Sequence, residues 1–451
     1  MRQEPGNTPP NAAQSPASAP AGATTPVLLH PSFFARFTEA LQITDFRRFV
    51  LAIACFTGAI QIQGTAQGWL VYHLTGSSLA IGVVQSLSSL MILLLSPLGG
   101  VLADRFEKKQ IIIISWVGAG LIFGALSVLI FTHQIQMWHL FVGSVLSGLV
   151  FSFNITARFG LISQLVRDNL LKNAMATVAL TFNLNGLVFP LIGGVLIDVA
   201  GVGAAYASMT VLFFLAVLMA TRVSTLGVLH RTERTSILRD FAVGVGYVKA
   251  QPALLALLCV AFASVWLGQP YTVLLPQLAE ETLHAPASGL GLLFAMIGLG
   301  GIVGNVLLAS LNTDVRLGRL VLAMTAGAGI CLLGLALAKS MLAGAVVLFG
   351  LGLLGMPAFT ICESLLQRHT PPEMRGRIMS LYMVGWGLYP IGMLVSSALA
   401  DYFGLWLPLT IDGIGMVIVS VVILRFFPVI HVLNVRHNLP GPTRDAGQRL
   451  S

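Results

Sequence analysis

Residues 79–132 read LAIGVVQSLSSLMILLLSPLGGVLADRFEKKQIIIISWVGAGLIFGALSVLIFT, which is two long apolar segments joined by a short charged loop. A helix that crosses a bilayer needs about 20 consecutive, mostly apolar residues, and both segments reach that length. The loop contains the basic residues Arg105, Lys108 and Lys109. The stretch therefore predicts two membrane-spanning helices joined by a basic turn.

The same alternation of apolar segment and short loop continues along most of the chain. Of the 451 residues, 56% are hydrophobic and only 9% are charged, whereas a soluble domain has about 25% charged residues. We therefore expect an all-α membrane protein with twelve transmembrane helices in two pseudo-symmetric six-helix bundles. The expected spans are 49–73, 79–103, 110–132, 138–165, 173–199, 204–222, 252–278, 288–310, 319–338, 341–367, 378–401 and 404–427.

The positive charges favour one orientation of these spans. Loops with several Lys and Arg residues alternate with loops that have almost none, and in the second set only Lys339 is basic. Basic loops remain in the cytoplasm when a membrane protein inserts. We expect a multi-pass protein of the bacterial cytoplasmic (inner) membrane with both termini in the cytoplasm. This arrangement accounts for the net charge of +8 without a nucleic-acid partner.

The spans divide the chain into two bundles with a linker and two tails. Residues 1–45 are rich in Pro, Ala, Ser and Thr, a composition that predicts a disordered cytoplasmic tail. The N-terminal bundle is expected at 46–222, the C-terminal bundle at 252–427, and a second cytoplasmic tail at 428–451. The cytoplasmic linker 223–251 has apolar residues at helical spacing. This predicts an amphipathic helix that lies on the inner membrane surface or packs against the bases of the bundles.

The two halves of the sequence resemble each other. Pro190 and Pro390 occupy matching positions in the fifth and eleventh spans. Each of these spans ends in an acidic residue before a glycine turn, Asp198 in one and Asp401 in the other. Such internal duplication is typical of transporters built from two bundles around a site near the middle of the membrane.

Several motifs resemble the major facilitator superfamily. GGVLADRFEKK (99–109) resembles motif A of that superfamily, the loop between its second and third spans. WLVYHLTGSSLAIG (69–82) and MRGRIMSLYMVGWGLYPIG (374–392) resemble the drug and siderophore efflux branch, which includes macrolide and enterobactin exporters. The resemblance covers residues 40–427 and implies secondary-active transport by alternating access.

The resemblance also implies an inner gate. The gate residues carried over from motif A are Gly100, Asp104, Arg105, Lys108 and Lys109. Asp104 is expected to meet the start of span eleven when the cytoplasmic side is closed. A helix N-terminus carries unpaired N–H groups and about half a positive charge, which stabilise a carboxylate. The alternative is that these charges only fix the topology.

The motifs also depart from the branch at positions that bear on coupling. FNITAR (153–158) places Asn154 where the branch often has an aspartate, and Gly186 replaces an arginine of span five. Ionisable groups inside spans are costly and therefore candidates for function. The coupling candidates are Glu363, Arg158 and Asp412. Glu363 could instead be a snorkelling or paired gate residue, and for Asp412 a structural role is favoured.

Uncharged polar and aromatic side chains inside the spans are candidates for a substrate cavity. A cavity lined by them would suit a bulky, partly aromatic, amphipathic molecule. The alternative is that they serve helix packing and interfacial anchoring. The candidates are Gln63, Gln67, Asn154, Asn185, Trp266, Gln269, Tyr382 and Trp386.

The sequence contains no motif of an enzyme. It has no phosphate-binding loop, no HExxH motif and no Cys or His spacing typical of a metal site. We expect a proton-driven exporter of a small amphipathic molecule, a drug or siderophore, that works in the lipid bilayer as a monomer without a cofactor. A solute importer or uniporter is the alternative within transport, and a non-transporting membrane sensor is the alternative outside it.

Overall fold

The computed structural model describes residues 39–167, 170–224, 237–311, 316–428 and 430. All regular elements in this part of the chain are helices. Most of both predicted tails lies outside the described residues, and so do the side chains of 96–105, 155–156, 172 and 237–241.

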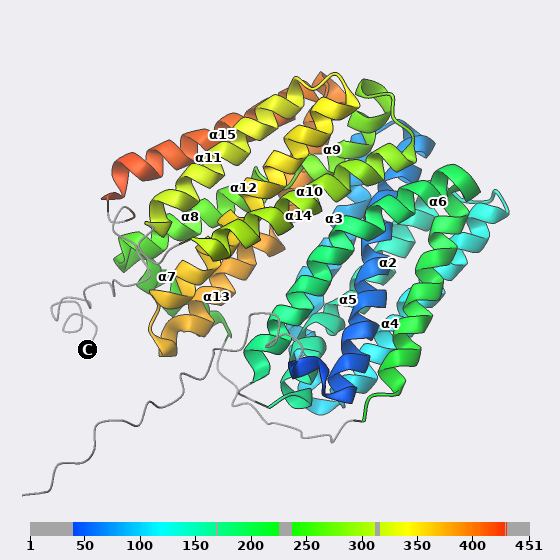
Figure 1. Cartoon of the computed structure of the whole chain (residues 1–451), viewed down its shortest axis with the longest axis horizontal. Helices are drawn as coiled ribbons and strands as arrows, with labels where there is room; N and C mark the ends of the chain where they lie inside the picture. Colours follow the sequence, from blue (N-terminus) through cyan, green and yellow to red (C-terminus); the bar gives the residue numbers. More distant parts are fainter. Residues whose placement is uncertain (1–38, 168–169, 225–236, 312–315, 429, 431–451) are drawn as a thin grey trace, which may run out of the picture.

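Five helices form the N-terminal half (Figure 1). The 51 residues of α6 are interrupted at Gly201, whose backbone (φ 80°, ψ 167°) is not helical, so that α6 can cross a membrane twice. The N-terminal half therefore supplies six crossings. The helices are α2 (Thr44–Thr75), α3 (Ser78–Arg105), α4 (Lys108–Phe131), α5 (Met137–Leu165) and α6 (Leu171–Thr221).

The C-terminal half also supplies six crossings, two of them built from shorter pieces. Pro276 and a π-helical turn follow α8 in the first crossing, and Leu388 separates α13 from α14 in the fifth. Proline lacks the N–H group that continues a helix, which favours such breaks. The elements are α8 (Pro252–Trp266), α9 (Tyr271–Gln277), η2 (Leu278–Thr282), α10 (Ala287–Ser310), α11 (Leu317–Ala336), α12 (Met341–Arg368), α13 (Pro372–Gly387), α14 (Tyr389–Phe403) and α15 (Trp406–Phe426).

The described helices bear out the predicted fold class. Eleven helical segments are long and apolar enough to cross a membrane, and one of them is the double-length α6. The chain is thus an all-α, multi-pass membrane protein, and its described residues form twelve crossings, six in each half.

The two halves lie against each other at one end and diverge toward the other (Figure 1). We call the first the closed end and the second the open end. The contact runs along α6 with α10 and α3 with α14. Glycines permit it, because a Cβ atom at Gly194 would overlap the backbone of Ala287, and one at Gly291 would overlap that of Pro190. The closed end carries turns 76–77, 132–136, 283–286 and 404–405, and the open end carries turns 106–107 and 369–371.

A helix is present in the predicted linker, α7 (Ile237–Ala250). It packs against α13, where Gly244 lies beside Arg377 and Leu381. Val248 is buried among the residues of the C-terminal half. These contacts correspond to the second alternative for this helix, packing against the base of a bundle.

Candidate functional site

A cavity of about 320 Å³ lies between the two halves. The N-terminal half lines it with α2 and α6, and the C-terminal half with α9, α10, α12 and the turn before α9. Its wall mixes apolar and uncharged polar groups. The lining residues are Gln61, Gly64, Thr65, Phe182, Asn183, Gly186, Pro190, Gln269, Tyr271, Thr272, Phe294, Ile297, Gly298, Gly301 and Met356.

Of the predicted cavity residues, Gln269 is the one that lines this cavity. Gln63 and Gln67 do share a helix face, but that face points into the N-terminal half: Gln63 Nε2 donates to Gln67 Oε1 at 3.1 Å. Gln67 Nε2 in turn donates to Ser144 Oγ of α5 at 3.0 Å. Gln61, a polar residue of the same helix that is not among the predicted cavity residues, lines the cavity instead.

Four of the other predicted cavity residues contact neighbouring helices. Asn185 Nδ2 donates to the carbonyl of Ala54 at 2.8 Å and so ties α6 to α2. Trp266 Nε1 donates to the carbonyl of Gly385 at 3.1 Å and so ties α8 to α13. Tyr382 is buried in the core of the C-terminal half. Trp386 packs on Phe359 and Tyr389.

Arg158 lies deep in the N-terminal half, surrounded by aromatic rings. Its guanidinium carbon is 4.9 Å from the centre of the Phe182 ring, 5.7 Å from Phe56 and 5.6 Å from Phe159. Among the described residues, no carboxylate forms an ion pair with it. Asn154, one turn earlier on α5, is buried, and neither of its amide atoms has a hydrogen-bond partner among the described residues.

The two carboxylates considered for coupling differ in environment. Glu363 on α12 is half-buried near the open end and accepts a hydrogen bond from Gln367 Nε2 at 3.1 Å. Asp412 on α15 is buried and accepts one from Ser396 Oγ of α14 at 3.1 Å. Neither lines the cavity. Asp412 therefore joins two helices of one half, whereas Glu363 contacts a residue of its own helix and is only half-buried.

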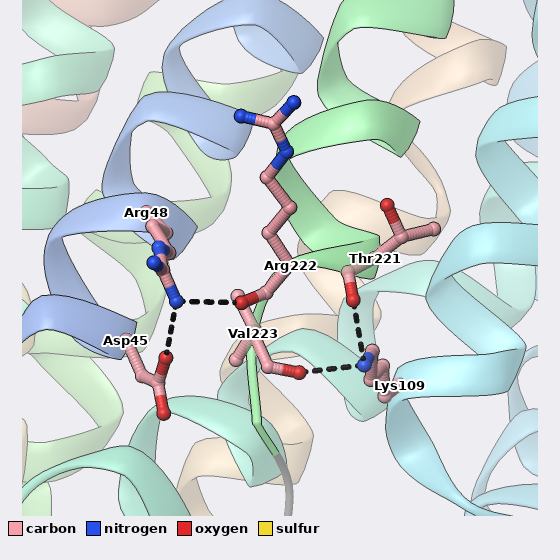
Figure 2. A network of polar contacts seen from close by, with 6 residues as sticks. All are labelled: Asp45, Arg48, Lys109, Thr221, Arg222 and Val223. Atoms are coloured by element: carbon pink, nitrogen blue, oxygen red, sulfur yellow. Dashed lines mark hydrogen bonds and ion pairs between the residues drawn. The ribbon is translucent and has the colours of Figure 1, made fainter.

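Lys109 of motif A and Arg48 of α2 bind the end of α6 and the residues after it (Figure 2). Lys109 Nζ donates to the carbonyls of Thr221 at 3.1 Å and Val223 at 2.6 Å. Arg48 Nη1, from α2, donates to the carbonyl of Arg222 at 2.9 Å and to Asp45 Oδ1 at 3.3 Å. The last carbonyls of a helix lack partners and carry partial negative charge, so basic groups stabilise them.

The remaining motif A residues are only partly described. Lys108 lies beside Gly160 of α5. The structure does not describe the surroundings of Gly100 or the side chains of Asp104 and Arg105. The expected contact between Asp104 and α13 therefore stays a prediction.

Two aspartates fasten the closed end by capping helices of the opposite half. Asp198 of α6 accepts hydrogen bonds from the backbone N–H groups of Ala287 at 3.0 Å and Ser288 at 2.9 Å, where α10 begins. Asp401 of α14 accepts from the N–H groups of Ser78 at 2.7 Å and Leu79 at 3.1 Å, where α3 begins.

The two caps are related by the internal repeat. Asp198 stands in DVAG (198–201) and Asp401 in DYFG (401–404). Both glycines have left-handed φ values, 80° at Gly201 and 86° at Gly404. A positive φ is open to glycine without steric cost, so both glycines allow the chain to turn directly after the capping residue.

A further polar cluster joins the halves at the closed end. Tyr72 Oη of α2 donates to Glu281 Oε1, and Gln277 Nε2 donates to Glu281 Oε2 at 2.9 Å. Ser78 Oγ of α3 donates to Gln277 Oε1 at 2.8 Å. His73 Nδ1 lies 4.0 Å from Glu280 Oε1. Together with the two aspartates, this cluster joins the two halves at the closed end.

The sequence matches one family model over almost its whole length. Residues 39–443 match the family described as transmembrane secretion effector. Similar curated proteins are enterobactin exporters. The chain is 27% identical to that of Citrobacter koseri over 88% of this chain and 91% of the relative. It is also 27% identical to that of Salmonella paratyphi A over 93% of this chain and 96% of the relative.

A solved structure has the same fold. It is a bacterial homolog of the human lysosomal transporter Spinster, in an inward-facing and unoccupied conformation. The TM-score is 0.62 at 12% sequence identity, over 88% of this chain and 95% of the other.

Proposed function

The chain belongs to the transmembrane secretion effector family of major facilitator superfamily transporters, and from this premise we propose that it exports a small amphipathic molecule of the siderophore class across the bacterial inner membrane. It is a transporter rather than an enzyme, and alternating access is the mechanism of its superfamily. Direction, substrate class, coupling ion and cellular membrane are parts of the proposal.

The observation that carries the proposal is the cavity between two halves that Asp198, Asp401 and Glu281 fasten at the closed end. Its volume of about 320 Å³ lies within the usual range for small-molecule sites, about 300–1,000 Å³. The basic residues at the open end support its assignment to the cytoplasm by the positive-inside rule. In that orientation the molecule is ready to take up a solute from the cytoplasm.

The character of the cavity wall supports an amphipathic solute. Aromatic groups such as Phe182, Tyr271 and Phe294 lie beside the amides of Gln61 and Gln269. Such a wall binds a largely apolar molecule and orients it through a few hydrogen bonds. The curated relatives are named as exporters of enterobactin, which favours export over the alternative of import.

A proton gradient is the proposed energy source. Glu363 supports this because it is a half-buried carboxylate near the open end, where it can exchange a proton with the cytoplasm. The alternative of a uniporter would need no such group.

The experiment is transport in proteoliposomes that contain the purified protein. A panel of siderophores and amphipathic drugs is offered from the side of the open end, with and without a pH gradient. We expect pH-gradient-driven uptake of at least one siderophore. Exchange that ignores the gradient would replace the proposal with a uniporter, and no transport of any compound would overturn it.

A cavity-filling variant tests whether transport uses this cavity. Gly64 lines it and has open space where a side chain would begin, so Gly64→Leu fills the cavity without a backbone clash. We expect transport to fall about tenfold or more, because a filled cavity excludes solute. Gly246 on α7 has equal space but lies outside the cavity, so Gly246→Leu is the matched control. Equal rates for the two variants would contradict the assignment.

A further inference from the structure

The guanidinium of Arg158 is the most deeply placed charge among the described residues of the N-terminal half. The side chain is 8% exposed, and its Nε has no hydrogen-bond partner in the part of the chain that the structure describes. Phe56, Phe159 and Phe182 surround it. Aromatic faces attract a cation but do not cancel its charge, and a charge buried in this way is costly unless an anion balances it.

The described acidic side chains of the same half are at the helix ends. Asp45 is bonded to Arg48, and Asp198 caps α10. Glu39 and Glu107 lie at the open end, at or before the start of their helices. On the other half, Glu363 is bonded to Gln367. The described protein groups therefore leave the charge of Arg158 without a counterion.

Asn154 adds a second binding group beside this charge. It is 1% exposed, and no described residue forms a hydrogen bond with its amide nitrogen or its amide oxygen. Residues four apart share a helix face, so Asn154 and Arg158 lie on the same side of α5. Buried polar groups are normally paired, and two such neighbours without partners indicate a binding site.

This pair lies next to the wall of the central cavity. Phe182 lies 4.9 Å from the guanidinium of Arg158 and also lines the cavity. We propose that Arg158 and Asn154 form an anion-binding subsite that receives a carboxylate or phenolate group of the transported molecule, whose apolar body occupies the cavity. This inference rests on the proposed export function and names the chemistry of its substrate.

The residue types fit this role. A guanidinium presents a planar fork of N–H groups that binds a carboxylate with two parallel hydrogen bonds. The surrounding rings are suited to a planar, aromatic anion, since they can stack on its apolar part. The amide of Asn154 can donate to a second oxygen. A small inorganic anion such as chloride could satisfy the charge but would gain nothing from the rings or the cavity.

Binding of two matched probes tests the subsite. The probes are 1-naphthoate, which is an anion at neutral pH, and 1-naphthamide, which has nearly the same shape without the charge. Affinities are measured by calorimetry on the full-length protein in nanodiscs, in chloride-free buffer. We expect the wild type to bind naphthoate about tenfold or more tightly than naphthamide, and added chloride to compete only weakly.

Variants of Arg158 should remove this preference selectively. Arg158→Gln should lower the affinity for naphthoate about tenfold or more and leave that for naphthamide within about twofold. Arg158→Lys, which keeps the charge but not the fork, should retain part of the preference. Arg167 is exposed just beyond the same helix, so Arg167→Gln is the matched control and should bind both probes like the wild type.

The outcomes separate this inference from the proposed function. Equal affinity of the wild type for both probes, binding of neither, full retention of the preference by Arg158→Gln, or displacement by chloride as strong as by naphthoate overturns the subsite. If Arg158→Gln does not fold, Asn154→Ser serves in its place, and an unchanged preference there also overturns it. If the protein transports neutral solutes as well as charged ones, the proposed export function stands and the anion-binding subsite is wrong. If the protein shows an Arg158-dependent preference for naphthoate but transports nothing, the subsite stands and the export function is wrong.

Discussion

The carboxylates of Glu363 and Asp412 show how neighbouring groups separate two chemically similar residues. Both belong to helices that can span a membrane. Glu363 contacts the exposed Gln367 one turn away on the same helix, whereas Asp412 receives its hydrogen bond from a buried serine of another helix. A group that must release a proton to water needs access to it, so Glu363 is better suited to coupling.

Replacement of each carboxylate by its amide tests this distinction. We expect Glu363→Gln to abolish efflux driven by a pH gradient while substrate binding stays within about twofold, because the amide keeps the contact with Gln367 but carries no proton to exchange. Transport in proteoliposomes with and without the gradient measures this. Asp412→Asn is the control and should transport normally, since its amide oxygen can still accept from Ser396. Loss of coupling in the Asp412 variant alone would reverse the assignment.

The sequence predicts which polar residues lie inside the spans but not which of them line the cavity. Gln61, Gln63 and Gln67 all lie on α2, yet only Gln61 lines the cavity. In a soluble helix the polar face points to solvent. In a membrane helix most faces are apolar, and a polar residue points either to the cavity or to a neighbour such as Ser144. The choice depends on neighbouring helices, which the spacing along one helix does not encode.

At the level of elements, the ends of α6 and α14 perform the same task in the two halves. Asp198 and Asp401 each cap a helix of the opposite half with two backbone hydrogen bonds. The repeat of an acidic residue before a glycine is visible in the sequence, but what the acidic residue binds is not. The capped helix belongs to the other half. Asp198 is 89 residues away from Ala287, and Asp401 is 323 residues away from Ser78.

Removal of both charges should loosen the closed end. An asparagine can accept one of the two hydrogen bonds but brings no negative charge to the helix N-terminus. We expect Asp198→Asn and Asp401→Asn each to destabilise the closed arrangement of the two halves by about 1–3 kcal/mol, the scale of hydrogen bonds to charged groups. The distance distribution between spin labels on the two halves at the closed end should shift to longer values, most strongly in the double variant.

The control for the aspartate variants is Asp45→Asn. Asp45 contacts Arg48 of its own helix at the open end, so its replacement should leave the closed-end distances unchanged. Wild-type distances in the double variant would mean that the caps do not hold the halves together.

The basic contacts in Figure 2 give the end of α6 a fixed position where the linker begins. Lys109→Gln replaces the charged amine that binds two carbonyls there. We expect the end of α6 to fray, so that limited proteolysis between residues 223 and 236 becomes about threefold or more faster. Lys339→Gln, at the opposite end of the helices, should have no effect. An unchanged cleavage rate in Lys109→Gln would leave this contact without a structural role.

At the scale of the whole molecule, the number of crossings follows from the order of apolar and polar segments alone. Each crossing needs a long apolar segment, and each turn between crossings is a short polar segment. The conformational state does not follow. It depends on which of two sets of contacts between the halves is formed, and the sequence contains residues for both. The hydrogen bonds that Asp198, Asp401 and Glu281 form across the interface belong to the closed end.

A disulfide across the closed end tests alternating access directly. A Cβ atom built on Gly82 of α3 would lie 3.0 Å from Cβ of Ser397 on α14, and disulfides have Cβ atoms about 3.5–4.5 Å apart, so helix movement of about 1 Å is enough. We expect Gly82→Cys with Ser397→Cys to cross-link under oxidation, to abolish transport, and to regain it on reduction, because a transporter held in one state cannot cycle. A cysteine placed beside the cavity should still react with reagents from the open end in the cross-linked protein. Each single variant, which cannot form the bond, should be insensitive to oxidant. Full transport by the cross-linked protein would show that the closed end does not need to open.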